Sequence, residues 1–132
     1  YVTVETGYTG SNYAMLRSTA TSVGTAQTFH YCWHTDGDSN HWALRSAATG
    51  LYVSAEFEYS GTDKGMMRAR AGAVGPWERF SRIYNSGYKN WQFTSSGQFA
   101  VSELDFTGSR QAMLRVRSWT PDIWERFSPV WL

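Results

Sequence analysis

Short segments in which apolar and polar residues partly alternate recur along the whole chain, and they are rich in β-branched and aromatic side chains. This pattern predicts β-strands with one buried face. Helical periodicity is absent from the sequence, so an all-β fold is expected. The predicted strands cover residues 1–5, 14–17, 28–33, 41–46, 51–56, 65–68, 78–83, 90–94, 98–103, 112–115 and 125–130.

Three copies of one pattern account for most of these strands. Residues 1–29 align without a gap with residues 52–80, and again with residues 99–127. Repetition at this period indicates a body built from three similar units. Five positions are identical in all copies: Glu5/Glu56/Glu103, Gly10/Gly61/Gly108, Met15/Met66/Met113, Arg17/Arg68/Arg115 and Phe29/Phe80/Phe127.

These identical positions are interpreted mainly as scaffold. Apolar residues kept three times are expected in the core, which places the Met and Phe positions there. The Gly falls in the loop of a predicted hairpin, where a positive φ costs glycine little. The Glu and Arg lie on the two strands of that hairpin, and we expect an ion pair or an Arg-to-backbone hydrogen bond. A ligand site that includes Glu56, Glu103, Arg68 and Arg115 is the alternative.

Units two and three each begin with one further strand. A complete unit therefore has four short strands in roughly 45–50 residues, a spacing typical of a small all-β barrel. Three such units predict a β-trefoil, in which six strands close a barrel and three hairpins cap one end. We expect a single domain over residues 1–132, with approximate units at 1–38, 39–86 and 87–132.

Unit one lacks its opening strand in this prediction, and a complete trefoil requires about fifteen further residues before Tyr1. That strand lies outside the sequence, was removed, or comes from a neighbour. An unpaired edge in its place favours self-association. No signal-peptide pattern precedes the first strand, so the chain is interpreted as mature or excised from a larger protein.

Composition and charge limit the classes of partner that the chain is expected to bind. A net charge of +1, with basic residues scattered among acidic ones, argues against nucleic-acid binding through bulk charge. No segment approaches the ~18 consecutive apolar residues of a membrane helix, so no membrane insertion is expected. The single Cys32 excludes an internal disulfide. Aromatic residues make up 17% of the chain and include seven Trp, which favours a surface that stacks on sugars or bases.

One dipeptide is shared by only two of the three copies. Trp77-Glu78 and Trp124-Glu125 occupy matched positions, where unit one has Ala26-Gln27. Joint loss indicates a joint role. An exposed indole can cover the apolar face of a pyranose, and a carboxylate beside it can accept hydrogen bonds from two hydroxyls of the same ring. The structural alternative is that Trp caps the end of the barrel while Glu accepts backbone N–H groups in a tight turn.

A family resemblance follows from these segments. Three segments resemble fascin-like β-trefoils: Leu-Arg-Ser at 44–46, Gly-Leu-Tyr-Val-Ser-Ala-Glu at 50–56 and Val-Gly-Pro-Trp-Glu-Arg-Phe at 74–80. They also resemble family 92 carbohydrate-binding modules, which are attached to polysaccharide-degrading enzymes. The resemblance covers the whole chain, which lacks the Gln-x-Trp signature of ricin-type lectins.

This resemblance implies up to three sites, one per unit, each built around a Trp and a Glu. It implies β-1,3- and β-1,6-glucans, or red-algal galactans, as ligands. Carried over position by position, the ligand residues are Trp77, Glu78, Trp124 and Glu125. Unit one departs from the motif at Ala26-Gln27, so it carries no implied site.

Enzyme chemistry has little support in the sequence. His30 and His34 precede Asp36 and Asp38, but this spacing is a weak zinc signature. Residues 36–40 have the composition of a calcium loop without the glutamate that an EF-hand needs, and a polar turn is expected there. Neither a nucleophile elbow nor a phosphate loop is present. Glu78 and Glu125 lie in different units, which argues against a glycosidase acid pair.

These observations together predict a non-catalytic, secreted carbohydrate-binding module or lectin without cofactor or metal. It would bind an oligosaccharide or polysaccharide, of the β-glucan or algal galactan class, through units two and three. An origin as accessory module of a larger glycoside hydrolase chain is compatible with this interpretation. The alternative is a fascin-like protein-interaction domain of the actin-bundling type.

Overall fold

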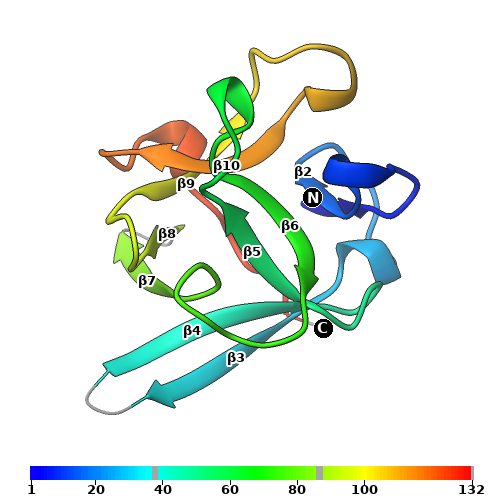
Figure 1. The fold of residues 1–132 in the computed structure, drawn as a ribbon. Coiled ribbons are helices and arrows are strands. Elements are labelled where there is room, and N and C mark those ends of the chain that lie inside the picture. Colours follow the sequence, from blue (N-terminus) through cyan, green and yellow to red (C-terminus); the bar gives the residue numbers. More distant parts are fainter. Residues whose placement is uncertain (37–38, 86–87, 132) are drawn as a thin grey trace.

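The fold is all-β. The computed structural model describes residues 1–36, 39–85 and 88–131. All strand pairs in it are antiparallel, and the strands form one 10-stranded sheet (Figure 1). The strands are β1 (Thr3–Glu5), β2 (Met15–Arg17), β3 (Phe29–Asp36), β4 (Ser39–Ser46), β5 (Tyr52–Glu56), β6 (Met66–Ala71), β7 (Phe80–Asn85), β8 (Tyr88–Phe93), β9 (Phe99–Glu103) and β10 (Met113–Ser118).

Short 3-10 turns connect several of these strands. They are η1 (Gly10–Asn12), η2 (Thr25–Gln27), η3 (Gly61–Asp63), η4 (Gly108–Arg110) and η5 (Ile123–Glu125). Three of them, η1, η3 and η4, occupy the same place in the three copies, and their first residue is the repeated glycine, with φ of 60°, 62° and 64°. The predicted glycine loops are therefore confirmed. In the described part of the chain no helix has the length and apolarity to span a membrane.

Ten of the eleven predicted strands are present, and the eleventh, residues 125–130, is wrong. This segment makes only one isolated bridge, between Lys89 and Phe127. The matched segments of units one and two are β3 and β7, and each pairs along its length with the strand that follows it, β4 or β8. No described strand lies in the corresponding place beside residues 125–130, so the segment lacks the partner that would extend it.

The three hairpins β1–β2, β5–β6 and β9–β10 are joined in a ring. The second strand of each pairs with the second strand of the next, through the registers Met15↔Arg68, Met66↔Arg115 and Met113↔Arg17. Backbone hydrogen bonds repeat the pattern: Ala69 donates to Ala14, Val116 to Gly65 and Ser18 to Ala112. Each of the three junctions joins the same two positions of the repeat, so the ring has approximate threefold symmetry (Figure 1).

Apolar side chains fill this ring from within. Met15, Met66 and Met113 are fully buried and form one cluster, against which Tyr8, Tyr59 and Phe106 pack. A larger cluster contains the next position of each copy, Leu16, Met67 and Leu114, together with Phe80 and Phe93. The predicted core role of the Met positions and of Phe80 is confirmed. Phe29 and Phe127 pack against the same cluster but are only half-buried.

Candidate functional site

The repeated Glu and Arg form the expected ion pair and also the backbone hydrogen bond. The Glu56–Arg68 and Glu103–Arg115 pairs are 3.1 and 3.3 Å long, and the Glu5–Arg17 pair is 3.8 Å. Each Arg also donates from Nε to a carbonyl of a neighbouring unit, at Gln111, Tyr13 and Lys64 respectively for Arg17, Arg68 and Arg115. These contacts join the hairpins, which gives Glu56, Glu103, Arg68 and Arg115 a structural role. A ligand role for them stays a prediction.

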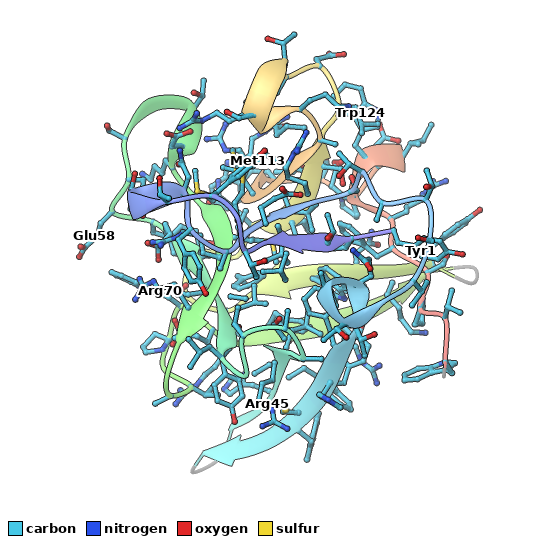
Figure 2. The ribbon with its side chains drawn as sticks, turned by 90° about the vertical axis from the view of Figure 1, so that its right-hand side faces the viewer. Tyr1, Arg45, Glu58, Arg70, Met113 and Trp124 are labelled. Carbon is cyan, nitrogen blue, oxygen red and sulfur yellow. The ribbon has the colours of Figure 1, made fainter. Side chains whose placement is uncertain are left out.

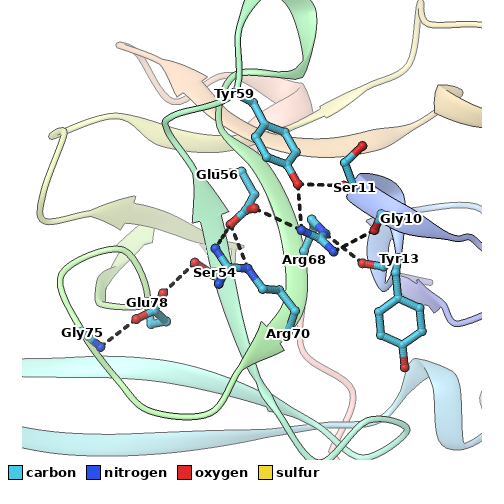
Figure 3. Close-up of polar contacts among 10 residues, drawn as sticks. All are labelled: Gly10, Ser11, Tyr13, Ser54, Glu56, Tyr59, Arg68, Arg70, Gly75 and Glu78. Atoms are coloured by element: carbon cyan, nitrogen blue, oxygen red, sulfur yellow. Dashed lines mark hydrogen bonds and ion pairs between the residues drawn. The ribbon is translucent and has the colours of Figure 1, made fainter.

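A second arginine joins this pair in units two and three. Arg70 donates from Nε and Nη2 to Glu56 Oε1 (Figure 3). Arg117 donates from the same two atoms to Glu103. The carboxylates are buried, but the side chains of Arg70 and Arg117 are 39% and 43% exposed. Each guanidinium therefore binds a buried carboxylate on one edge, while another part of it faces solvent. Unit one has Thr19 at this position.

The Glu78 carboxylate is buried and holds the turn that precedes β7. Its Oε1 accepts from the Gly75 backbone N–H at 2.7 Å, and its Oε2 accepts from Ser54 Oγ at 2.6 Å (Figure 3). Glu125 is buried as well, and its Oε1 accepts from Ser118 Oγ at 3.0 Å. The contact of Glu78 with a backbone N–H is of the kind that the structural alternative predicts. Ligand binding by the two carboxylates stays a prediction.

In unit one the uncharged side chain of Gln27 makes the equivalent hydrogen bonds in the matched turn. Its Oε1 accepts from the Gly24 backbone N–H at 2.8 Å, and its Nε2 donates to Thr3 Oγ1 at 2.7 Å. Gly24 and Thr3 are the counterparts of Gly75 and Ser54. The turn therefore tolerates an amide in place of the acid, so turn formation alone does not explain why units two and three carry a charged residue.

The charge of Glu78 acts on the second arginine. The hydrogen bond that Arg70 donates to Glu56 is the main cause that raises the pKa of Arg70, and the negative charges of Glu56 and Glu78 add to it. Arg117 behaves in the same way: the hydrogen bond that it donates to Glu103 is the main cause that raises its pKa, and the negative charge of Glu125 adds to it. Where the second arginine is replaced by Thr19, the acid is replaced by Gln27. The arginine and the acid therefore change together.

Trp77 and Trp124 are half-buried and lie within the same turns, directly before the acids. The Trp77 carbonyl accepts from the Ala55 backbone N–H at 3.0 Å, which fixes the turn against β5. Trp124 lies in η5. Figure 2 places Arg70 of unit two and Trp124 of unit three well apart, so the two sets of residues occupy different parts of the molecule.

Sequence reasoning missed Arg70 and Arg117, although the signal was present. Aligning the three copies puts both arginines opposite Thr19, so they share the distribution of the Trp-Glu pair. They follow the identical Arg68 and Arg115 by two residues and so lie on the same face of the strand. The set common to units two and three is therefore a Trp, a buried acid and a partly exposed arginine.

A metal centre has no support in the described part of the chain, where no three His, Cys, Asp or Glu side chains gather. Gly37 and Asp38, at the centre of the predicted polar turn at 36–40, lie outside the described residues, as do the side chains of His34 and Asp36. His30 is exposed.

Comparisons with known proteins do not assign the chain. No protein-family model matches it, and no curated protein matches its sequence. The resemblance to fascin-like trefoils and family 92 modules is therefore a hypothesis that rests on the residues themselves.

Proposed function

We propose that the chain is a non-catalytic, secreted carbohydrate-binding module that binds a polysaccharide through two sites. The site of unit two is formed by Trp77, Glu78 and Arg70, and that of unit three by Trp124, Glu125 and Arg117. One observation carries the proposal: the three positions change together in unit one, to Ala26, Gln27 and Thr19. Residues that serve the shared scaffold have no reason to change as a set.

The body that carries these sites is proposed to be a β-trefoil. The ring of three hairpins supports it, since each hairpin pairs with the next through matched positions. The two clusters of threefold-related apolar residues also support it. In this architecture equivalent turns of different units point in different directions, which suits a module that contacts a long polymer at more than one place.

The chemistry of each site fits a neutral sugar. A half-buried indole offers the exposed part of its apolar face to the C–H groups of a pyranose ring. The guanidinium of Arg70 uses Nε and Nη2 for Glu56, which leaves its Nη1 edge to donate to sugar hydroxyls. Because buried Glu56 fixes the arginine before the ligand arrives, little side-chain entropy is lost on binding. In the free protein Glu78 is committed to its turn, so we propose that it positions Trp77 and Arg70.

Two shallow sites on one body act together on a polymer. Each is expected to bind weakly, because a flat stacking surface buries little of the ligand. Simultaneous binding at both sites raises the apparent affinity by a factor on the order of 10² or more when the polymer can reach both. A β-glucan or an algal galactan is the proposed ligand class.

Affinity electrophoresis in native gels that contain soluble β-glucan or galactan tests the proposal. Trp77→Ala and Trp124→Ala are each expected to reduce retardation, and the double variant to abolish it. Trp119→Ala is the matched control, because Trp119 is 70% exposed and lies outside both sites. If the double variant keeps its fold by circular dichroism and is still retarded like the parent, the proposal is wrong. Cosedimentation of the parent with F-actin, without retardation by glycan, would instead support the protein-interaction alternative.

A further inference from the structure

An apolar groove of about 700 Å³ lies beside the proposed sugar site of unit three, since Trp124 is among the residues that line it. Phe29, Tyr31, Leu44, Trp91, Phe127 and Trp131 are among the residues that line it. Large hydrophobic side chains along it are exposed: Tyr1 is 54% exposed, Ile123 69% and Trp131 72%. Exposed apolar surface of this kind usually marks an interaction site.

Three strand edges beside this groove lack a neighbour that their counterparts have. β5 pairs with β4 as well as with β6, and β9 pairs with β8 as well as with β10, whereas β1 pairs with β2 alone among the described strands. β7 pairs with both β4 and β8, whereas β3 pairs only with β4 in the described sheet. The segment around Phe127 pairs with β8 on one side.

All three unpaired edges would be neighbours of a single additional strand, equivalent to β4 and β8. β4 contacts β3, β5 and β7, and β8 contacts β7, β9 and the segment around Phe127. By the repeat, the third strand of this series would contact the segment around Phe127, β1 and β3. Phe127 and Phe29 of these elements line the groove, together with Tyr1, which lies just before β1. One added strand would therefore satisfy every unpaired edge around it.

We propose that this groove binds an extended polypeptide segment, from outside residues 1–132, that has the residue pattern of β4 and β8. Strand addition of this type gains affinity from backbone hydrogen bonds and specificity from alternate side chains. The proposal rests on the unpaired strand edges and the groove, so it does not depend on the proposed function, although Trp124 lines the groove as well.

The register defines the residue pattern of the bound segment. Arg45 pairs with Tyr52 and Gln92 pairs with Phe99, so the matched residue of the bound strand lies opposite Tyr1. The residue before it is large and buried in both known strands, at Leu44 and Trp91. The segment therefore needs a large apolar residue followed by a polar one.

The turn that follows the strand is also shared. Gly50 donates to the Ser46 carbonyl, Gly97 donates to the Phe93 carbonyl, and the two glycines have φ of 71° and 70°. This left-handed backbone favours glycine. A glycine four residues after the last strand residue is therefore the third element of the expected pattern.

A dye-labelled peptide with the sequence of residues 39–51 tests the proposal by fluorescence anisotropy with the full chain. It is expected to bind saturably, and the peptide with Leu44→Asp is expected to bind at least tenfold more weakly, because it places a charge in the apolar groove. Trp131→Ala in the protein should weaken binding several-fold. Trp119→Ala, equally exposed but outside the groove, should leave it unchanged.

A fusion provides the second measurement. Residues 39–51 placed directly before Tyr1 should raise the thermal midpoint of the chain and prevent binding of the free peptide. The same extension with Leu44→Asp should do neither. The proposal is overturned if the free peptide does not bind and the extension leaves the midpoint unchanged. A dimer of the chain in sedimentation experiments that the peptide fails to dissociate would also overturn it, because a second copy would then occupy the groove.

Discussion

Arg110 and Asp63 occupy the same position in consecutive copies of the repeat, and they form a two-point ion pair across the ring of hairpins. The Nε–Oδ1 distance is 2.6 Å and the Nη2–Oδ2 distance is 2.7 Å. The third member of the set, Asn12, accepts from Arg110 Nη2 at 3.4 Å. Three like charges would repel one another at this meeting point. The three copies therefore carry different residues at this position, where the equivalent side chains contact one another.

This pair predicts a loss of stability in acid. The pKa of Asp63 lies below its ordinary value, mainly because Arg110 donates to the carboxylate. A carboxyl with a lowered folded-state pKa stabilises the fold above its unfolded pKa of about 3.9, and this contribution is lost as pH falls through the folded value. Asp63→Asn should lower the thermal midpoint at pH 7 but flatten its fall below about pH 4.

The exchange of the two charges is the control for this prediction. Asp63→Arg with Arg110→Asp restores opposite charges at equivalent positions. Each single substitution should destabilise by about 1 kcal/mol or less, because the pair is partly exposed, and the double variant should recover most of the loss. Additive losses in the double variant would show that the pair has no coupling energy.

Left-handed residues at one repeated position predict opposite effects in different units. Ala14 and Ala112 have φ of 64° and 59°, a conformation that strains any residue with a Cβ atom. Ala14→Gly should raise the free energy of unfolding by about 0.5–1 kcal/mol after the entropy of the unfolded glycine is counted. At the matched Gly65, a Cβ atom would lie 2.3 Å from the Val116 carbonyl oxygen. Gly65→Ala should therefore destabilise by more than about 2 kcal/mol, measured by urea unfolding.

The repeated acids should differ in their contribution to stability. Glu56 is buried and binds both Arg68 and Arg70, whereas Glu5 is 23% exposed and lies 3.8 Å from Arg17. Glu56→Gln leaves two arginines without their counter-charge and should cost about 2–4 kcal/mol. Glu5→Gln should cost under about 1 kcal/mol. Equal losses in denaturant unfolding would contradict the importance of the second arginine.

Glu78→Gln separates a turn role from a ligand role. Gln27 shows that an amide can hold this turn, so the variant should unfold within about 1 kcal/mol of the parent. Its retardation in glycan gels should nevertheless fall, because the charge that acts on Arg70 is lost. Full retention by a stable Glu78→Gln variant would show that the acid serves only the turn. Glu125→Gln should behave in the same way for the site of unit three.

Much of the fold could be predicted because the same residue pattern occurs in three copies. Glycine loops, hairpins and the buried Met positions depend on local pattern, and alignment of the copies made each one visible. The strand at 125–130 was predicted wrongly, because a strand needs a neighbour and the sequence pattern of Phe127 carries no information about what lies beside it. The same lack of a neighbour leaves Phe29 and Phe127 half-buried at the groove.

The candidate site was predictable only in part. The alignment identified Trp77 and Trp124 as residues outside the common scaffold. It could not show that Glu78 and Glu125 are buried. Either a carboxylate or an amide can accept the hydrogen bond in this turn, so the residue type alone does not reveal the contact. The proximity of Arg70 to Glu56 depends on the register of two strands, Tyr52↔Ala71 through Glu56↔Met66, which includes a bulge that no sequence pattern specified.

The number of ligand sites tests the central claim most directly. Isothermal titration with a short oligosaccharide of the polysaccharide that is retained best should give two sites per chain. Trp77→Ala and Trp124→Ala should each leave one site, and the double variant none. Three sites in the parent, or two sites that persist in either single variant, would contradict a threefold body with ligand sites in units two and three only.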